Sequence, residues 1–243
     1  MFQPTDPSLE SLYPLRNLLP EALPTEPFGM LTRWMDDARE AGNQPNPTSM
    51  NLCTLDADGT PSARIVLCRG VDADRGILTF FTNDGSRKGR AMKADPRVAL
   101  TFHWDHADRQ IRVEGRAVKS SDETSDAYFE SRTLAKRLGA WSSDQSRPIE
   151  SREELIAKVA EVVQRFGIDP QNPPSEEESK GMIPRPPHWG GWHVVAKSVE
   201  IWAGEGGRIH DRAVWTRELR ETGADNPMEA YEGSEWSATR LQP

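Results

Sequence analysis

Hydrophobic and polar residues alternate along most of the chain in short runs that turn residues separate. Residues 50–56 and 62–69 flank the polar turn ADGTP and predict a β-hairpin, and residues 76–82 predict a third strand. The same alternation continues over residues 97–104, 109–120, 192–204, 208–218 and 235–243. Because these strands are short and sequential, the pattern favours an antiparallel barrel over a parallel, doubly wound sheet.

Helical periodicity interrupts the strands in four places. The first helix is expected to begin at an N-cap, Thr25, and to end at Gly42. A short helix is expected to start at Ser86. Ser120 and Ser151 each stand three residues before a glutamate, which is the capping-box spacing, and predict two further helix starts.

The pattern divides the chain into an arm and one domain. Residues 1–25 are rich in proline and are expected to form an N-terminal arm that stays mobile or wraps another surface. Residues 168–187 are rich in proline and acid and are expected to form a surface loop. Since no repeat or linker divides the rest, residues 26–243 are expected to form a single domain, mainly β with flanking helices.

Composition narrows the class of protein. The 243 residues include 30 basic and 38 acidic side chains, and the net charge of −8 argues against a nucleic-acid partner. The longest apolar run, residues 65–68, is too short for a membrane span or a signal peptide. Two cysteines cannot build a disulfide framework, so a cytoplasmic location is expected, and the five histidines lack the spacing of a metal site.

Basic residues nevertheless gather locally. Arg87 and Lys88 stand in the first turn of a predicted helix, directly after a glycine-containing turn. Free N–H groups at a helix start, together with two cations, would bind a phosphate, although a solvated helix start would show the same residues. Arg64 and Arg69 bracket an apolar segment, so one of them lies on an apolar face unless the strand is at a sheet edge.

Two more basic groups have regular spacing. Arg208, His210 and Arg212 recur at a period of two and are expected on one side of a strand, where they either surround an anion or lie exposed on a barrel rim. Another group recurs at a spacing of four and would line one helix face, as either a phosphate site or a solvated surface; it consists of Tyr128, Arg132 and Lys136. Residues 139–146 are expected to form a polar loop.

Nine motifs occur in order along the chain: RIVLCR, FFTNDGSRKGR, DPRVALTFHW, RQIRVEG, AYFESR, GAWSSDQS, PRPPHWGGW, EIWAGEGGRIHDR and RLQP. Together they resemble the pyridoxamine 5'-phosphate oxidase family, from residue 26 to the C-terminus, with interruptions mainly at 168–183 and 222–233. The resemblance implies a split β-barrel homodimer that holds FMN at the subunit interface. It also implies oxidation of pyridoxamine or pyridoxine 5'-phosphate to pyridoxal 5'-phosphate, with O2 as acceptor and H2O2 as product.

The resemblance carries the family's site onto particular residues. The positions implied for FMN are Arg64, Ile65, Val66, Leu67, Arg69, Phe81, Thr82, Arg87, Lys88, Gln110, Gln145, Ser146, Trp202 and Arg212. The positions implied for the substrate phosphate are Arg69, Tyr128, Arg132 and Lys136. Arg208 and His210 fall where the family covers the substrate ring and carries out catalysis.

Several positions depart from the family pattern. Arg69 replaces a lysine, Lys136 replaces a serine and Phe81 replaces a tyrosine. In the arm, Glu10 replaces an arginine that stands three residues before Tyr13. Because the substrate positions depart more than the flavin positions, two alternatives stay open: an FMN-dependent oxidase of another aromatic substrate of the phenazine type, and a flavin-binding protein without catalysis.

Overall fold

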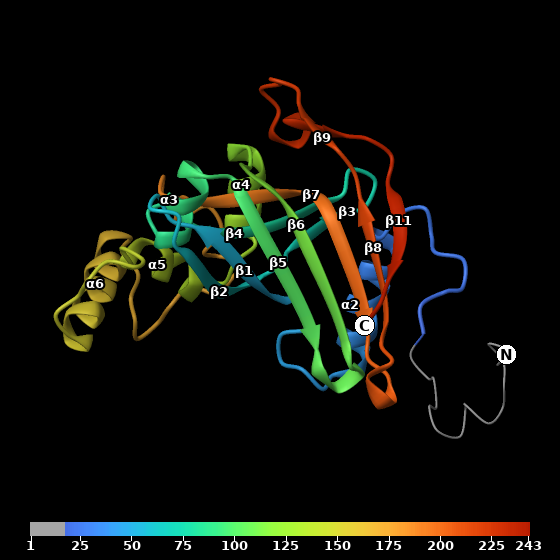
Figure 1. Ribbon diagram of the computed structural model, residues 1–243. Helices are drawn as coiled ribbons and strands as arrows, with labels where there is room; N and C mark the ends of the chain where they lie inside the picture. The colour runs from blue at the N-terminus through green and yellow to red at the C-terminus, as the bar shows by residue number, and fades with distance from the viewer. Residues whose placement is uncertain (1–17) are drawn as a thin grey trace, which may run out of the picture.

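A nine-stranded antiparallel sheet organises residues 18–243, the part of the chain that this computed structural model describes (Figure 1). The strands of this sheet are β1 (Ser49–Leu55), β2 (Pro61–Leu67), β3 (Gly70–Asp72), β4 (Ile77–Asn83), β5 (Arg97–Trp104), β6 (Arg109–Lys119), β7 (Trp189–Ala203), β8 (Asp211–Thr216) and β11 (Ser237–Leu241). A separate hairpin consists of β9 (Leu219–Glu221) and β10 (Tyr231–Gly233). The predicted antiparallel, mainly β fold is confirmed, although β3, β9 and β10 were not among the predicted strands.

Strand β7 links the two halves of the sheet. Along the main path the strands are ordered β11-β8-β7-β6-β5-β1-β2. The first half of β7 pairs with β4 on the side away from β6, and its second half pairs with β8 instead. The strand bends sharply where its neighbour changes (Figure 1).

A β-bulge lies at this change of neighbour. The register between β6 and β7 shifts between Glu114 and Gly115, and Lys197 is the extra residue on β7. A Cβ atom on Gly115 would lie 2.2 Å from the carbonyl oxygen of Val195, so only glycine allows the two backbones to approach this closely. The buried Arg217 side chain, directly after β8, donates from Nε to Ala196 O of β7 and from Nη2 to Arg75 O, close to the start of β4, each at 2.8 Å.

The sheet curls around the larger of two hydrophobic cores. Helix α2 (Phe28–Ala41) packs Phe28, Leu31 and Met35 into that core. Gly42 ends the helix in the left-handed conformation, as predicted. The predicted N-cap Thr25 is wrong, because Pro27 occupies that position and the Glu26 carboxylate accepts the N–H groups of the first turn.

The other helices are α3 (Arg87–Ala94), α4 (Asp122–Glu130), α5 (Leu134–Ser142) and α6 (Arg152–Arg165). Ser86 and Ser151 cap α3 and α6 as predicted, whereas the N-cap of α4 is Ser121 and not Ser120. Short 3-10 turns lie at Asp105–Ala107, Gly206–Arg208 and Pro227–Glu229.

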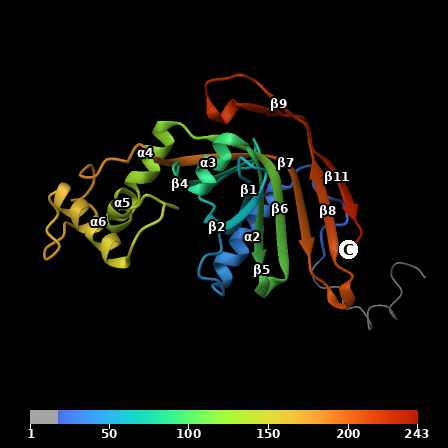
Figure 2. The ribbon, with the colours of Figure 1, turned by 60° about the vertical axis from the view of Figure 1, so that its left-hand side comes forward.

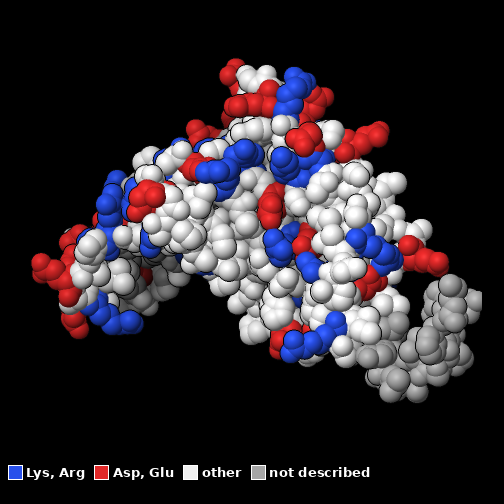
Figure 3. All heavy atoms as spheres, in the orientation of Figure 1, with Lys and Arg blue, Asp and Glu red and all other residues white. Residues whose placement is uncertain are grey.

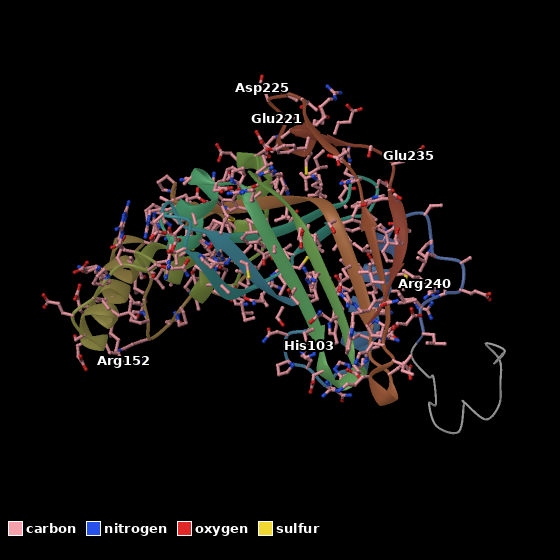
Figure 4. All side chains as sticks on the ribbon, viewed as in Figure 1. His103, Arg152, Glu221, Asp225, Glu235 and Arg240 are labelled. Atoms are coloured by element: carbon pink, nitrogen blue, oxygen red, sulfur yellow. The ribbon has the colours of Figure 1, made fainter. Side chains whose placement is uncertain are left out.

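Helices α4, α5 and α6 form a lobe beside the barrel (Figure 2). Its small core contains Phe129, Leu134, Leu138 and Trp189, together with two side chains from the segment expected to be a surface loop, Ile168 and Ile183. The 168–187 segment is irregular in conformation and mostly exposed, in line with the expected surface loop, although Ile183 is fully buried. Figure 4 labels Arg152, the first residue of α6, on this lobe.

The described end of the arm lies against the barrel. Leu19 is buried, and its N–H donates to the Asp211 carboxylate at 3.0 Å. Arg240 of β11 points toward this segment (Figure 4) and donates to Pro20 O at 2.6 Å. Residues 18–25 therefore wrap the β8–β11 edge, while Glu10 and Tyr13 lie outside the described residues.

The bulge generates a stability prediction. Gly115→Ala is expected to lower the free energy of unfolding by about 1–3 kcal/mol, because the new methyl group must displace backbone atoms of β7. Urea unfolding followed by tryptophan fluorescence measures the change. Gly139→Ala is the matched control: nothing lies within 4 Å of its added Cβ, and alanine within α5 is expected to raise stability by about 0.5–1 kcal/mol. A Gly115→Ala protein as stable as the wild type contradicts the packing argument.

Candidate functional site

A cleft of about 1060 Å³ lies between the barrel and the lobe. Strand β2 lines one side, and the end of β4 and the start of α3 line the base. The elbow between α4 and α5 lies opposite. The lining includes most of the residues implied for FMN and all four implied for the substrate phosphate: Arg64, Ile65, Val66, Leu67, Arg69, Phe81, Thr82, Arg87, Lys88, Tyr128, Arg132, Lys136, Gln145 and Ser146.

Lys88 is a buried cation at the base of the cleft. It stands in the first turn of α3, where Ser86 caps the helix by accepting the Gly89 N–H. The Lys88 ammonium donates to Gln145 Oε1 at 2.8 Å and to Ser86 Oγ at 3.1 Å. Burial, followed by repulsion from Arg64, lowers the pKa of Lys88 to about 8. Among residues 18–243 no carboxylate pairs with this ammonium, so the position favours an anion.

Arg64 approaches the same base from β2. Its guanidinium donates to Thr54 Oγ1 at 2.8 Å, to Ser62 Oγ at 2.7 Å and to Leu52 O at 3.1 Å. Partial burial lowers its pKa. Strand β2 pairs only with β1 and ends the main path of the sheet, so the edge alternative weighed from the sequence is correct.

Arg87 is arranged differently from Lys88. Its side chain is 54% exposed, and its Nε donates to the Asp56 carboxylate at 2.8 Å. The hydrogen bond to Asp56 raises the pKa of Arg87. Arg87 thus reaches the cleft with an acidic partner, whereas the hydrogen-bond partners that the structure describes for Lys88 are neutral.

Stacked aromatic rings form the wall below the elbow. The Phe81 ring lies 3.8 Å from the Tyr128 ring and 5.5 Å from the Trp189 ring, with all three nearly parallel. The Arg132 guanidinium lies over Trp189 at 4.7 Å. Its Nη1 is buried without a hydrogen-bond partner among the described residues, and burial lowers its pKa. An unsatisfied buried donor of this kind suits an anionic acceptor.

The elbow corrects a sequence expectation. Tyr128, Arg132 and Lys136 do not share one helix face, because α4 ends at Glu130 and α5 begins at Leu134. All three still line the cleft. Residues 139–142 belong to α5, so only the second half of the expected 139–146 loop is irregular.

A second cluster lies at the far end of the barrel. Gln110, Trp202 and Arg212 are direct cross-strand neighbours on β6, β7 and β8. The His210 ring centroid lies 4.7 Å from that of Trp202, and His210 Nδ1 accepts the Glu205 N–H at 3.1 Å. The Nε of Arg212 is buried without a partner among the described residues.

The expected single strand face for Arg208, His210 and Arg212 is wrong. β8 begins only at Asp211, and Arg208 lies in the preceding 3-10 turn with a φ of 63°, a left-handed conformation uncommon outside glycine. The two clusters also do not meet within one chain. Trp189 and Trp202 stand near opposite ends of the 15-residue β7, which at a rise of about 3.3 Å per residue gives a path of roughly 40 Å.

Comparisons with known proteins place the chain among its relatives. A family model described as "Pyridoxamine 5'-phosphate oxidase" matches residues 36–166, and one described as "Pyridoxine 5'-phosphate oxidase C-terminal dimerisation region" matches residues 189–243. The chain belongs to the pyridoxamine 5'-phosphate oxidase family.

Curated members of the family match almost the whole chain. A pyridoxine/pyridoxamine 5'-phosphate oxidase of Paraburkholderia phytofirmans is 43% identical over 97% of both chains. One of Burkholderia mallei is 45% identical over 89% of both chains. These relatives support the predicted family membership and an oxidase of this type.

Solved structures share the fold. PhzG from Burkholderia lata, solved with tetrahydrophenazine-1-carboxylic acid, is 28% identical, with a TM-score of 0.75 over 93% of this chain and 98% of that one. An FMN-binding protein from Nostoc punctiforme, related to pyridoxamine 5'-phosphate oxidase, is 18% identical, with a TM-score of 0.62 over 88% of this chain and 96% of that one, and shows the fold alone.

Several residues that line the cleft were not predicted from the sequence. Asn83 donates to Ser143 O at 3.2 Å, and Ser131 and Thr133 belong to the elbow. Trp189 belongs to PRPPHWGGW, one of the nine motifs that resemble the family, but no role was expected for it from the sequence. The link between Asp56 and Arg87 spans 31 residues, so no local pattern indicates it.

Within residues 18–243, no three or more histidine, cysteine, aspartate or glutamate side chains gather in a way that could hold a metal ion. Among the helices of the same residues, none combines the length and the apolar character needed to cross a membrane. Cys53 and Cys68 are free thiols.

The pKa of Lys88 generates a pH prediction for the cleft, with FMN as the phosphate-bearing probe. Below about pH 8 the ammonium is charged in the free protein, whereas above it a bound phosphate dianion must draw a proton onto Lys88. The affinity of the apoprotein for FMN is therefore expected to fall above about pH 8, by up to about tenfold per pH unit. Quenching of FMN fluorescence between about pH 7 and pH 9 measures it.

Lys88→Met is the control, because it removes the titrating group: binding should be weaker at pH 7 and nearly independent of pH up to about pH 9. A wild-type affinity that stays constant over this range would show that Lys88 does not contact the phosphate.

Proposed function

We propose that the protein is an FMN-dependent oxidase that converts pyridoxamine or pyridoxine 5'-phosphate to pyridoxal 5'-phosphate, with O2 as acceptor and H2O2 as product. One observation carries the proposal: a single cleft contains two separate groups of cations. Arg64 and Lys88 lie at its base, and Arg132 and Lys136 lie at the elbow. Two groups fit two phosphates, one on the cofactor and one on the substrate.

The residues at the base fit the phosphate of FMN. The start of α3 offers backbone N–H groups beside the Lys88 ammonium, and Arg64 adds a guanidinium. Burial lowers the pKa of both cations: the Asp56 carboxylate offsets only part of this effect at Arg64, and repulsion from Arg64 adds to it at Lys88. The remaining FMN positions on this side of the cleft are Ile65, Val66, Leu67, Arg69, Phe81, Thr82, Arg87, Gln145 and Ser146. FMN, when bound, would supply hydride acceptance and reoxidation by O2.

The elbow fits the phosphate of the substrate. Arg132 has an unsatisfied buried donor, and Lys136 makes no hydrogen bond or ion pair with the described residues. Arg69 lies close enough to Arg132 to lower its pKa, and Tyr128 adds a hydroxyl. Three cations in one region repel one another until an anion binds. We therefore propose that the site requires a phosphorylated substrate.

A homodimer would complete the site. The second cluster contains the remaining positions implied for FMN, Gln110, Trp202 and Arg212, but it lies far from the cleft of its own chain. We propose that a partner chain brings this cluster to the cleft, so that Arg208 and His210 cover the substrate ring. The match to the dimerisation region over residues 189–243, which include the second cluster except for Gln110, supports this arrangement.

The outer face of the sheet beside the cleft suits such a partner. Two cross-strand rows on β2, β1 and β5 are uncharged, Ala63–Cys53–Ala99 and Ile65–Asn51–Thr101. Ile65 is 65% exposed on the edge strand β2. A surface without charged side chains at a sheet edge favours association. Figure 3 shows charged side chains of both signs over other parts of the molecule. A cytoplasmic location remains part of the proposal.

The second candidate is an oxidase of another aromatic substrate. The observation that favours it is the similarity to PhzG, whose structure contains a tetrahydrophenazine carboxylic acid. A carboxylate could also pair with the extra charge of Lys136. Substrate choice therefore has to be measured directly.

The proposed function predicts which compounds reduce bound FMN. Pyridoxamine or pyridoxine 5'-phosphate, mixed anaerobically with the holoprotein, should bleach the flavin absorbance, and free pyridoxamine should not, because the cations at the elbow would stay unpaired. Admission of O2 should restore the absorbance and release H2O2. If a non-phosphorylated aromatic carboxylate bleaches the flavin and neither phosphorylated compound does, the phenazine-type candidate replaces this one. Failure of every compound favours flavin binding without catalysis.

A shared site predicts complementation between defective chains. Arg132→Ala disables the cleft and Arg208→Ala disables the second cluster, so each homodimer should be inactive while retaining FMN. A dimer of one chain of each kind contains one site in which both halves are intact. Co-expression in equal amounts should therefore restore about a quarter of wild-type activity. A mixture that stays inactive although mixed dimers are isolated would show that each site lies within one chain.

A further inference from the structure

Arg137 is a buried arginine that does not line the cleft. It lies on α5, and its side chain is only 1% exposed. Its Nη1 donates to Ser179 O at 2.8 Å and its Nη2 donates to Ser179 Oγ at 2.6 Å. Ser179 is fully buried and belongs to the proline- and acid-rich segment that interrupts the family resemblance. A guanidinium buried this deeply fixes its partners in place, because moving them would leave its donors unsatisfied.

The same segment holds both sides of the α4–α5 elbow. At the end of α4, the Glu130 carboxylate accepts the Gly181 N–H at 2.7 Å. At the start of α5, the Glu176 carboxylate accepts the Leu134 N–H at 2.8 Å. Thr133, the N-cap residue of α5, makes no capping hydrogen bond with its own side chain, so Glu176 performs this role from 42 residues away.

The elbow held in this way faces the cleft. Ser131, Arg132 and Thr133 lie between the two anchored helix ends, Lys136 follows one turn later, and all four line the cleft. The proposed cations for the substrate phosphate therefore lie on a short connection whose position depends on a distant segment. A pre-positioned cation binds an anion more tightly, because less conformational freedom is lost on binding.

We propose that residues 176–181, which we call the brace, position the α4–α5 elbow and thereby set the affinity of the site for the anionic group of its substrate. This inference rests on the proposed function for the identity of that ligand. Glu176 and Ser179 of the brace, and Arg137 to which it binds, are positioning residues. They act through Arg132 and Lys136 and do not line the cleft themselves.

The test compares two variants of the FMN-loaded protein. Glu176→Ala/Ser179→Ala removes the cap on α5, the hydrogen bond from Arg137 to Ser179 Oγ, and the ion pair of 4.0 Å between Arg137 and Glu176. Glu177→Ala is the matched control, because this neighbouring glutamate is 80% exposed and, within residues 18–243, its carboxylate pairs with Lys180 of its own segment alone. The probe is pyridoxal 5'-phosphate, whose binding is followed by its own absorbance. Hydrogen–deuterium exchange reports on the elbow amides without any ligand.

The double variant is expected to bind pyridoxal 5'-phosphate about three- to tenfold more weakly. Exchange at residues 131–136 should become faster, and KM for the phosphorylated substrate should rise with kcat within about twofold. FMN content should not change, because Arg64 and Lys88 lie on β2 and α3. Glu177→Ala should match the wild type. Glu176→Gln, which keeps a side-chain oxygen for the Leu134 N–H, should recover most of the loss from Glu176→Ala.

Several outcomes would overturn the proposal. Unchanged exchange at the elbow would show that the brace does not position it. A fall in kcat at constant KM, or loss of FMN, would show a general structural role. If the wild-type protein neither binds pyridoxal 5'-phosphate nor is reduced by the phosphorylated compounds, the proposed function fails, and the exchange comparison still decides whether the brace positions the elbow.

Discussion

The close approach of β6 and β7 at Gly115 is the constraint on which the rest of the architecture depends. The bulge at Lys197 lets β7 bend and exchange one neighbour, β4, for another, β8. The cleft lies at the β4 end and the second cluster lies at the β8 end. A straight β7 without the bulge would pair with one strand along the whole of the edge that faces away from β6. It could then not pair with β4 beside the cleft and with β8 beside the second cluster. The Arg217 side chain, stacked at 4.3 Å on Trp236, links β7 to the start of β4 at this point through hydrogen bonds to Ala196 O and Arg75 O.

Local patterns predicted those parts of the fold that short-range forces determine. Alternating residues located the principal strands, and the capping serines Ser86 and Ser151 located two helix starts, because a side chain and an N–H group three residues apart interact directly. The break between α4 and α5 was missed. It depends on Glu176 capping Leu134 from another part of the chain, and no periodicity within residues 120–136 reports that contact.

The candidate site shows the same division. The basic residues after β4 could be found from the sequence, because a strand, a turn and a helix start are local features. The difference between their surroundings could not be found in this way. Arg87 pairs with the Asp56 carboxylate, whereas the described partners of Lys88 are neutral, and this depends on how the β1–β2 turn lies over α3. Likewise, the family resemblance implied that all the FMN positions belong to one site. A single chain holds these positions in two groups, one at each end of β7. Only the folded geometry separates them.

Strand β2 also affects how the chain behaves while it folds. Its outer edge offers unpaired N–H and C=O groups, and Ile65 is exposed beside them. A newly made chain with such an edge can either form its native assembly or aggregate by pairing with the edge strand of another chain. The rates of both reactions rise with protein concentration. Yield of soluble protein would then depend on which encounter is faster. Slow synthesis in the presence of a ligand that binds only the native protein would favour native association. Such a ligand lowers the concentration of the chains that can still aggregate.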